Sequence, residues 1–423
     1  MTTGFHMNDG VMHADDFALP DLAQRFGTPA YIYSAGVIRS QYEALTNALA
    51  KALPADKQPM LCYACKANSN IAVLSLLRGL GSGVEIISEG ELIRALKAGF
   101  TGDQMISTSF GKTDGEIRAC LEAGIYQLNL DSDAELERVN KVAAEMGVVA
   151  PVVFRINPNV TGGGHHKIST GRRRDKFGLG PDHIMAIYKT AEEMSNVQPF
   201  GLSMHIGSQV FTVESFKPAF EVMAELVHRL RGEGHTVERL DIGGGFPIMY
   251  RDEKLLDLDA YAGWVRDIVL PLDTEIQLEP GRYLTGNCGV LLCEANSIKT
   301  TQDKEFLVLD AGMNDLLRPT LYEAYHGVRP VANHNREARD YDVVGPVCET
   351  GDTFAEARTM PEIRQGEYVV IETAGAYGFA MASNYNSRPL PPEILIDGDK
   401  SAIIRPRQSY DEMLAGETIP EWL

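Results

Sequence analysis

The first two thirds of the chain alternate between short β-rich runs and stretches with helical periodicity, and this alternation constrains the fold more than any other feature. A strand that pairs in parallel with its predecessor must return through a crossover of a dozen or more residues, so helix-patterned connectors indicate a parallel sheet. Eight β-rich runs are present, at residues 61–66, 84–87, 105–108, 126–130, 152–156, 202–206, 240–242 and 275–279.

Eight strand–helix repeats predict an α/β fold, a closed (β/α)8 TIM-type barrel over residues 35–285, close to the roughly 250 residues typical of that fold. An open, doubly wound sheet is the alternative, because strand counting alone does not exclude it. From about Gly289 the pattern changes to β-rich runs separated by turn residues, at residues 290–300, 305–312, 341–349, 367–375, 393–397 and 401–406. We therefore predict a mostly β second domain formed by residues 1–34 together with 286–423. The N-terminal segment PAYIYS, residues 29–34, is a further candidate strand of this domain.

Helix signals support this reading. Ser88 with Glu91, and Ser132 with Glu135, have the spacing of a capping box, and Gly99 stands where the first of these helices should end.

Composition excludes several partners. The 39 Lys+Arg and 58 Asp+Glu residues give a net charge of −19, so we expect the surface to repel nucleic acid and anionic membranes. The chain shows neither a signal-peptide pattern at its start nor a run of about 18 apolar residues. Its 6 cysteines in 423 residues are expected to be free thiols. We expect a cytoplasmic protein that binds neither nucleic acid nor membrane.

Polar residues at the predicted strand ends point to one pocket, because a barrel builds its active site at the carboxyl ends of its strands. Lys66 ends the first run. As a desolvated amine it can attack a carbonyl, and the alternative is a lysine that extends into solvent. The triplet Gly243–Gly245 follows the seventh run and precedes an expected helix, an arrangement that favours a phosphate, although a tight turn is the alternative.

Two further residues end predicted strands. Glu279, after the eighth run, would keep a heterocyclic nitrogen protonated, or form an ion pair with Arg282. His205, after the sixth, would stack on such a ring, act as an acid or base, or be a hydrogen-bonded core histidine.

Seven segments in order resemble the fold-type III pyridoxal-phosphate-dependent decarboxylases, most closely the members that act on diaminopimelate. They are YACKAN, FRINPN with KISTG and KFGL, HIGSQ, EPGR, RPTLYEAYH, CETGD and GAYGFAMASNYNSRP. The resemblance spans nearly the whole chain. It implies a barrel that binds pyridoxal 5'-phosphate, a β domain that completes the active site, and a homodimer whose active sites lie at the subunit interface.

The resemblance also implies residue roles. Lys66 resembles the lysine bonded to the cofactor, Glu279 the partner of the pyridine nitrogen and His205 the residue stacked on the ring. Cys348 resembles a proton donor that, with its neighbour Glu349, comes from the other subunit. Further cofactor contacts are implied at Ser208, Gly245, Gly281, Arg282 and Tyr377. Substrate contacts are implied at Arg282, Arg318, Tyr322, Glu349 and Tyr377.

The expected reaction is decarboxylation of meso-2,6-diaminopimelate to L-lysine, the last step of lysine biosynthesis. Arginine binds a carboxylate through a planar fork of donors, so Arg318 and Arg282 would hold the distal carboxylate while Glu349 accepts from the distal ammonium. The carbanion left at the reacting carbon needs a proton, and a thiol with an ordinary pKa of about 8.5 stays protonated near neutral pH. The alternative role for Cys348 is a buried small hydrophobe.

Three positions depart from the family's pattern: GGGFP replaces GGGLG, Glu85 stands where aspartate is common, and Cys65 replaces an aliphatic residue. GGGFP is similar to polyamine-pathway enzymes, which keeps carboxynorspermidine decarboxylase and ornithine or lysine decarboxylase as alternatives. A catalytically inactive regulatory relative is another, although the retained site residues disfavour it. An alanine racemase-like enzyme would prefer an arginine at the ring nitrogen, so Glu279 disfavours it.

No metal site is expected. Cys62 and Cys65 form a C-x-x-C pattern, but residues three apart on a strand point to opposite faces. His165 and His166 are expected in a loop over the active site, and Arg172–Arg174 receives no function.

Overall fold

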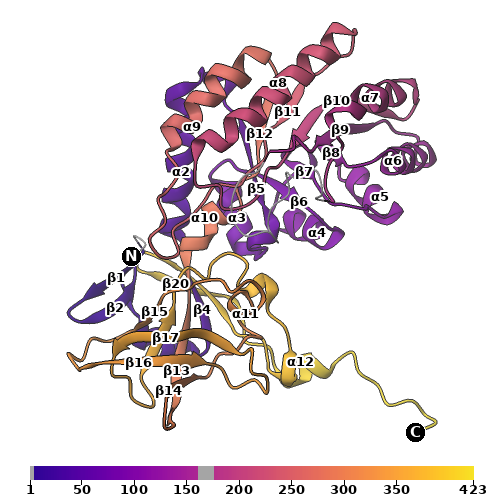
Figure 1. Ribbon diagram of the computed structural model, residues 1–423. Coiled ribbons are helices and arrows are strands. Elements are labelled where there is room, and N and C mark those ends of the chain that lie inside the picture. The colour runs from indigo at the N-terminus through magenta and orange to yellow at the C-terminus, as the bar shows by residue number, and fades with distance from the viewer. Residues whose placement is uncertain (1–3, 161–175) are drawn as a thin grey trace. The chain divides into compact units, whose positions relative to one another are not determined.

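The computed structural model describes residues 4–160 and 176–423. The chain forms two compact units (Figure 1). The barrel unit comprises residues 39–249 and 253–284, and the β unit comprises residues 1–38, 250–252 and 285–423. His165, His166 and Arg172–Arg174 lie outside the described residues.

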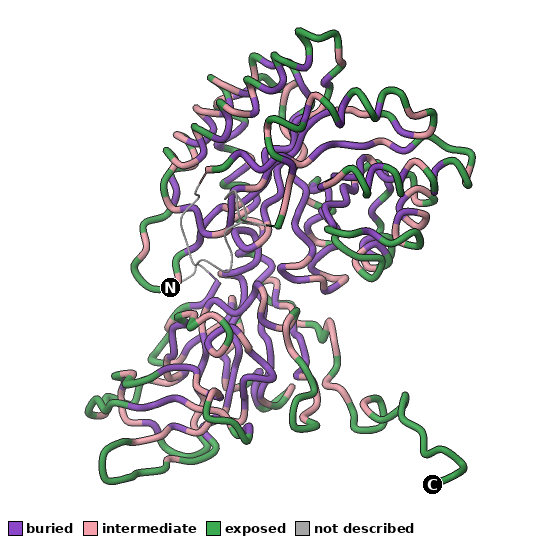
Figure 2. Tube along the Cα trace, turned by 45° about the vertical axis from the view of Figure 1, so that its right-hand side comes forward, coloured by how far each residue is buried: buried purple, intermediate pink, exposed green. Residues whose placement is uncertain are grey.

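The barrel unit contains a closed barrel of eight parallel strands, which confirms the predicted fold class and excludes the open sheet. Each expected run contains one strand, and most strand residues are buried (Figure 2), as expected where helices cover a parallel sheet. The strands are β5 (Met60–Ala64), β6 (Gly83–Ile86), β7 (Met105–Ser107), β8 (Gln127–Leu130), β9 (Ala150–Ile156), β10 (Val197–Met204), β11 (Arg239–Asp241) and β12 (Glu275–Leu278).

The helices around the barrel begin largely where the sequence signals predict. Ser88 accepts from the Glu91 N–H at 3.2 Å, but the Glu91 carboxylate accepts from the Ile87 N–H rather than from that of Ser88. Gly99 has a φ of +93°, which suits glycine after a helix end. The helices are α2 (Ala35–Ala52), α3 (Ile71–Gly79), α4 (Glu89–Lys97), α5 (Asp114–Glu122), α6 (Asp133–Met146), α7 (Ile184–Glu193), α8 (Phe216–Gly232) and α9 (Leu258–Trp264).

The β unit is built on one large, mostly antiparallel sheet. The N-terminal strand β4 (Ala30–Ser34) lies between β13 and β19, so the PAYIYS segment joins this sheet although more than 250 residues separate it from β13. The other strands of the sheet are β13 (Gly289–Thr300), β14 (Glu305–Leu309), β15 (Val328–Pro330), β16 (Ala338–Val344), β17 (Thr353–Pro361), β18 (Tyr368–Ile371), β19 (Glu393–Asp397) and β20 (Lys400–Arg405).

Several elements of the β unit were not predicted. Strands β15 and β17 are absent from the expected runs, as is the small sheet of β1 (Phe5–Asn8), β2 (Val11–Ala14) and β3 (Phe17–Ala18). The strands β1, β2, β3 and β15 have only two to four residues each, too few for a clear pattern. Tertiary packing holds the small sheet, because Phe5, Met12 and Ala14 join the apolar core of the unit. Its remaining helices are α1 (Leu19–Phe26), α11 (Arg318–Tyr322) and α12 (Tyr410–Leu414).

Within the described ranges, no helix combines the length and apolar character needed to cross a membrane.

Candidate active site

Lys66 lies just beyond strand β5, in a single 3-10 turn formed by Cys65–Ala67, so the expected strand through residue 66 is wrong by two residues. The turn leaves the Lys66 side chain about one third exposed, and its Nζ donates to both carboxylate oxygens of Glu85 at 3.1 and 3.0 Å. Glu85 on β6 is fully buried and also accepts from the Thr108 hydroxyl. The amine is therefore held in place at the carboxyl end of the barrel.

His205 follows β10 and lies beside Glu279, with 4.0 Å between Nδ1 and the Glu279 carboxylate. The Gly244 N–H donates to His205 Nδ1 at 3.1 Å. Because that nitrogen accepts, the ring is neutral. Burial lowers the pKa of His205 well below its ordinary value, and the charges of Arg155 and Lys66 add to the effect. A neutral ring suits stacking on an aromatic cofactor better than service as a cation.

Glu279 follows β12 and is 7% exposed. Burial and the neighbouring Asp241 and Glu85 carboxylates raise its pKa well above the ordinary value, while the charges of Lys66 and Arg155 oppose the rise. Burial and the neighbouring carboxylates therefore favour the neutral form of the Glu279 carboxyl group, which lies where it can share a proton with a nearby nitrogen.

The triplet Gly243–Gly245 follows β11 at the carboxyl end of the barrel. Each of its three positions requires glycine. A Cβ on Gly244 would lie 2.1 Å from the Glu279 main-chain oxygen, and one on Gly245 would lie 2.6 Å from that of Gly207. Gly243 and Gly245 also have positive φ values of +71° and +99°. No helix follows directly, since α9 begins only at Leu258, so the expectation of a helix N-terminus at this turn is wrong.

Backbone and side-chain donors gather beside this turn. Among the described residues, the Gly245 N–H has no hydrogen-bond acceptor. The buried Arg282 donates from Nε and Nη2 to the Ser208 hydroxyl at 3.3 and 3.2 Å. A Cβ on Gly281 would lie 2.9 Å from that of Ala64, so the chain passes closely at that point. Two of the residues predicted to contact the cofactor, Ser208 and Arg282, are therefore hydrogen-bonded to each other.

The other predicted residues belong to the β unit. Arg318 begins α11, is 7% exposed, and its Nε donates to His326 Nε2 at 3.3 Å. His326 Nδ1 in turn lies 2.8 Å from the Glu372 carbonyl oxygen. A carbonyl only accepts, so Nδ1 carries the proton and Nε2 is free to accept from Arg318. The Arg318 guanidinium also lies 5.9 Å from the ring of Tyr322.

Cys348 is exposed, whereas the other five free cysteines are buried, so it is not a small core hydrophobe. Its N–H donates to Asn386 Oδ1 at 3.0 Å. Glu349, also exposed, accepts from the Tyr385 hydroxyl at 2.8 Å. Tyr377 is half-buried with a φ of +56°, a conformation that is uncommon for a non-glycine residue and more frequent at binding sites.

Several buried partners were not predicted as site residues. Glu85, Asp241 and Asn129 all lie inside the barrel, and His326 lies behind Arg318. A charged residue within an apolar β-rich run was the available signal for Glu85 and Asp241. Nothing in the sequence marks His326 apart from its place in a family motif.

Cys62 and Cys65 occupy different environments. Cys62 lies near Gly83, 3.2 Å from the position a Cβ would take there, whereas Cys65 lies in the turn after β5. The expectation that both stand on one strand is therefore wrong. In the ranges the structure describes, no group of three or more metal-ligating side chains is close enough to hold an ion.

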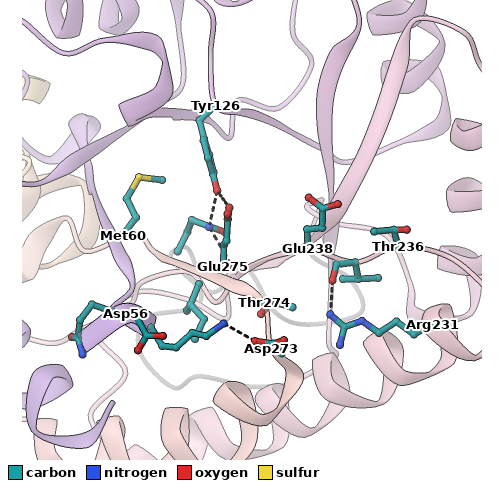
Figure 3. A pocket seen from close by; sticks show the side chains of 14 residues that line it. Asp56, Met60, Tyr126, Arg231, Thr236, Glu238, Asp273, Thr274 and Glu275 are labelled. Atoms are coloured by element: carbon teal, nitrogen blue, oxygen red, sulfur yellow. Dashed lines mark hydrogen bonds and ion pairs between the residues drawn. The ribbon is translucent and has the colours of Figure 1, made fainter. Parts of the chain in front are cut away.

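A cavity of about 770 Å³ lies at the opposite end of the barrel, beside the amino ends of β5, β8, β11 and β12 (Figure 3). Several of the side chains that line it have partners within the protein. Lys57 donates to Asp273 at 2.5 Å, Tyr126 donates to Glu275, and Arg231 donates to two main-chain oxygens. This cavity contains none of the predicted site residues.

Comparison with known proteins agrees with the barrel-end geometry. Residues 37–286 match the family described as pyridoxal-dependent decarboxylase, pyridoxal binding domain. The chain belongs to this family. It is 42% identical to the diaminopimelate decarboxylase of Pseudomonas aeruginosa over 415 residues, 98% of this chain and 99% of the relative.

Solved structures of family members are also similar. The diaminopimelate decarboxylase of Helicobacter pylori, complexed with L-lysine, is 36% identical with a TM-score of 0.89, covering 94% of this chain and 98% of that one. The enzyme of M. jannaschii in complex with L-lysine is 34% identical with a TM-score of 0.93, covering 100% and 99%.

The barrel end fits the cofactor of the pyridoxal-dependent decarboxylases. Pyridoxal phosphate has an aldehyde, a phosphate and a ring nitrogen. The barrel provides the Lys66 amine, a glycine turn that leaves no room for a Cβ, and the buried Glu279 carboxyl group. The donor set matches all three groups.

Proposed function

We propose that this chain decarboxylates meso-2,6-diaminopimelate to L-lysine with pyridoxal 5'-phosphate, the last step of lysine biosynthesis. The proposal rests chiefly on an amine, an imidazole and a buried carboxyl group gathered at one end of the barrel, at Lys66, His205 and Glu279. Full-length similarity to diaminopimelate decarboxylases supports this substrate over other amino acids.

In this proposal the bound cofactor supplies an electron sink for the charge left by CO2. Lys66 binds the aldehyde, His205 stacks on the ring, and Glu279 holds a proton at the ring nitrogen. A low-dielectric site strengthens that last contact, because the carboxyl group is nearly buried. The phosphate and its neighbourhood are held by Ser208, Gly245, Gly281, Arg282 and Tyr377.

The proposed substrate contacts recognise the two charged groups at the distal end of diaminopimelate. Arg318 and Arg282 carry buried guanidinium groups suited to the distal carboxylate, and Glu349 has an exposed carboxylate suited to the distal ammonium. Tyr322 and Tyr377 would also contact the substrate. Ornithine and lysine lack the distal carboxylate and would not make the arginine contact.

Cys348 is the proposed proton donor, supplied across a homodimer interface. Its exposure supports this role, because a thiol that acts in the active site of the neighbouring subunit must lie on the surface of its own subunit. Residues 35–285 would bind the cofactor, while residues 1–34 and 286–423 would complete the active site and the dimer. We also place the enzyme in the cytoplasm, where six free thiols stay reduced.

The shared site predicts complementation. Lys66→Ala and Cys348→Ala proteins should each be inactive, and mixing them should restore about one quarter of wild-type activity, because half of the exchanged dimers are mixed and each has one intact site. Carbon dioxide release measures the recovery, and native mass spectrometry of differently tagged chains measures the exchange. Mixed dimers without activity would place Lys66 and Cys348 in the same subunit's site.

A substrate panel tests the reaction. Purified protein loaded with pyridoxal phosphate should release carbon dioxide from meso-diaminopimelate with a kcat/KM at least about 10⁴-fold above that for lysine, ornithine, arginine or carboxynorspermidine, because a site built for a polar group rejects analogues lacking it. Preference for carboxynorspermidine or ornithine would replace the proposed substrate. No turnover of any substrate by cofactor-loaded protein would favour the inactive regulatory relative.

A further inference from the structure

Asp241 is a fully buried carboxyl group at the end of β11 that none of the roles above uses. Its Oδ1 accepts from the Gly243 N–H at 2.9 Å, at the start of the glycine turn. Its Oδ2 accepts from the Asn129 side-chain amide at 2.9 Å. Asn129 lies on β8, three strands away around the barrel. The Asp241 carboxyl group therefore links the glycine turn to the opposite side of the barrel.

The turn that Asp241 holds contacts the other site residues. The Gly243 carbonyl accepts from the Glu279 N–H at 2.9 Å, and the Gly244 N–H donates to His205 Nδ1 at 3.1 Å. A shift of Gly243 would therefore move the groups that orient both side chains. It would also move the Gly245 N–H, which follows two residues later.

The hydrogen-bond pattern requires a group that only accepts. Gln127 donates to Asn129 Oδ1 at 2.8 Å, so the Asn129 amide must point its NH2 at Asp241. The Gly243 N–H and the Asn129 amide each donate to a different oxygen of Asp241. A carboxylate accepts both bonds, whereas an amide would turn its own NH2 toward one of these donors. Burial raises the pKa of Asp241 to about 6, and the donors from Gly243 and Asn129, with a hydrogen bond involving Glu279, oppose the rise.

We propose that Asp241 is a positioning residue that holds the Gly243–Gly245 turn in the conformation that binds the cofactor phosphate. This inference rests on the proposed function, because it assigns the turn to the phosphate. Asp241 touches no substrate or cofactor itself. Its effect passes through the Gly243 N–H, so its loss should weaken binding of the phosphate more than binding of the pyridine ring.

The test compares two probes with the cofactor-free protein. Pyridoxal phosphate and pyridoxal differ only in the phosphate, so the ratio of their dissociation constants isolates the contribution of the turn. In Asp241→Asn and Asp241→Ala proteins, the dissociation constant of pyridoxal phosphate should rise about 10- to 100-fold, as for other residues that orient a ligand-binding group. That of pyridoxal should rise by a smaller factor, because the turn also contacts Glu279 and His205, which hold the ring. Equilibrium dialysis measures both.

Gln277→Met is the matched control. Gln277 is also buried inside the barrel, on β12, and donates to the Glu275 carbonyl at 3.1 Å without contacting the turn. The Gln277→Met protein should keep the wild-type ratio of the pyridoxal phosphate and pyridoxal dissociation constants. If Asp241 variants fail to fold, Asn129→Leu decides, because it removes one donor from Asp241 and should raise the ratio of the pyridoxal phosphate to the pyridoxal dissociation constant about threefold or more.

Each outcome has a definite meaning. A wild-type protein that binds neither probe would contradict the proposed function and not the role of Asp241. Wild-type binding with an unchanged ratio in the Asp241 variants, or in Asn129→Leu when only that variant folds, would overturn the positioning role. Equal weakening of both probes would show a general structural effect and would also overturn it.

Discussion

Replacing Lys66 with alanine should lower kcat on diaminopimelate by about 10⁴-fold or more, comparable to the loss of a covalent catalytic group in other enzymes. The side chain is the proposed attachment point of the cofactor, and its Nζ is held by Glu85 at 3.0 Å at the carboxyl end of the barrel. Carbon dioxide release measures the rate. Borohydride reduction of the wild-type protein followed by peptide mapping should place the cofactor on Lys66.

Two controls separate attachment from charge. Lys66→Arg keeps a cation beside Glu85 but has no amine that condenses with an aldehyde, so it should be as inactive as the alanine variant. Lys57→Ala removes a lysine at the opposite end of the barrel, where it pairs with Asp273, and should leave kcat unchanged. Cofactor mapped to another lysine, or an active Lys66→Arg protein, would contradict the assignment.

Replacing Arg318 with alanine should lower kcat/KM on diaminopimelate by about 10³-fold while leaving cofactor binding intact. Removing one partner of a buried charge pair typically costs about 2–5 kcal/mol, and Arg318 is 7% exposed and oriented by His326. The kcat/KM for lysine, which has no distal carboxylate, should change little. Steady-state kinetics with both substrates and an absorbance titration of bound cofactor measure the effect.

The control for Arg318 is an arginine of the same unit with another partner. Arg336 is also largely buried and binds Glu367 through two contacts of 2.7 and 2.8 Å. Arg336→Ala should therefore alter stability without changing the preference for diaminopimelate over lysine. Unchanged kcat/KM in Arg318→Ala would remove the proposed contact with the distal carboxylate.

The barrel was predictable because its strands have a local signature. Each parallel strand is covered on both sides and therefore tends to read as a short apolar run, as in β5, where all five residues are apolar and four are buried. Helix starts were predictable for a similar reason. Ser88 and Ser132 cap the helices that follow them through hydrogen bonds between residues only three apart in the sequence. The small N-terminal sheet lacked such a pattern and was missed.

The predictions from local sequence pattern were wrong at the ends of strands. Lys66 was expected on β5 and lies in a 3-10 turn, and the glycine triplet was expected to start a helix that begins only at Leu258. Both errors concern the short segments that carry the site. Such segments are shaped by close approaches between strands, like that of Gly244 to Glu279, and not by their own periodicity.

The sequence by itself determined the eight strand–helix repeats, the addition of a β domain and the types of reactive group, because these depend on periodicity and on residue chemistry. Closure of the eight strands into a barrel, where the sequence left an open sheet as the alternative, was decided by the tertiary structure. Tertiary structure alone decided which groups hold one another. Lys66 and Glu85 are 19 residues apart, and Asn129 and Asp241 are 112 apart, yet each pair is hydrogen-bonded. The raised pKa of Glu279 likewise depends on burial and on carboxylates from other strands, and burial is a property of the closed barrel.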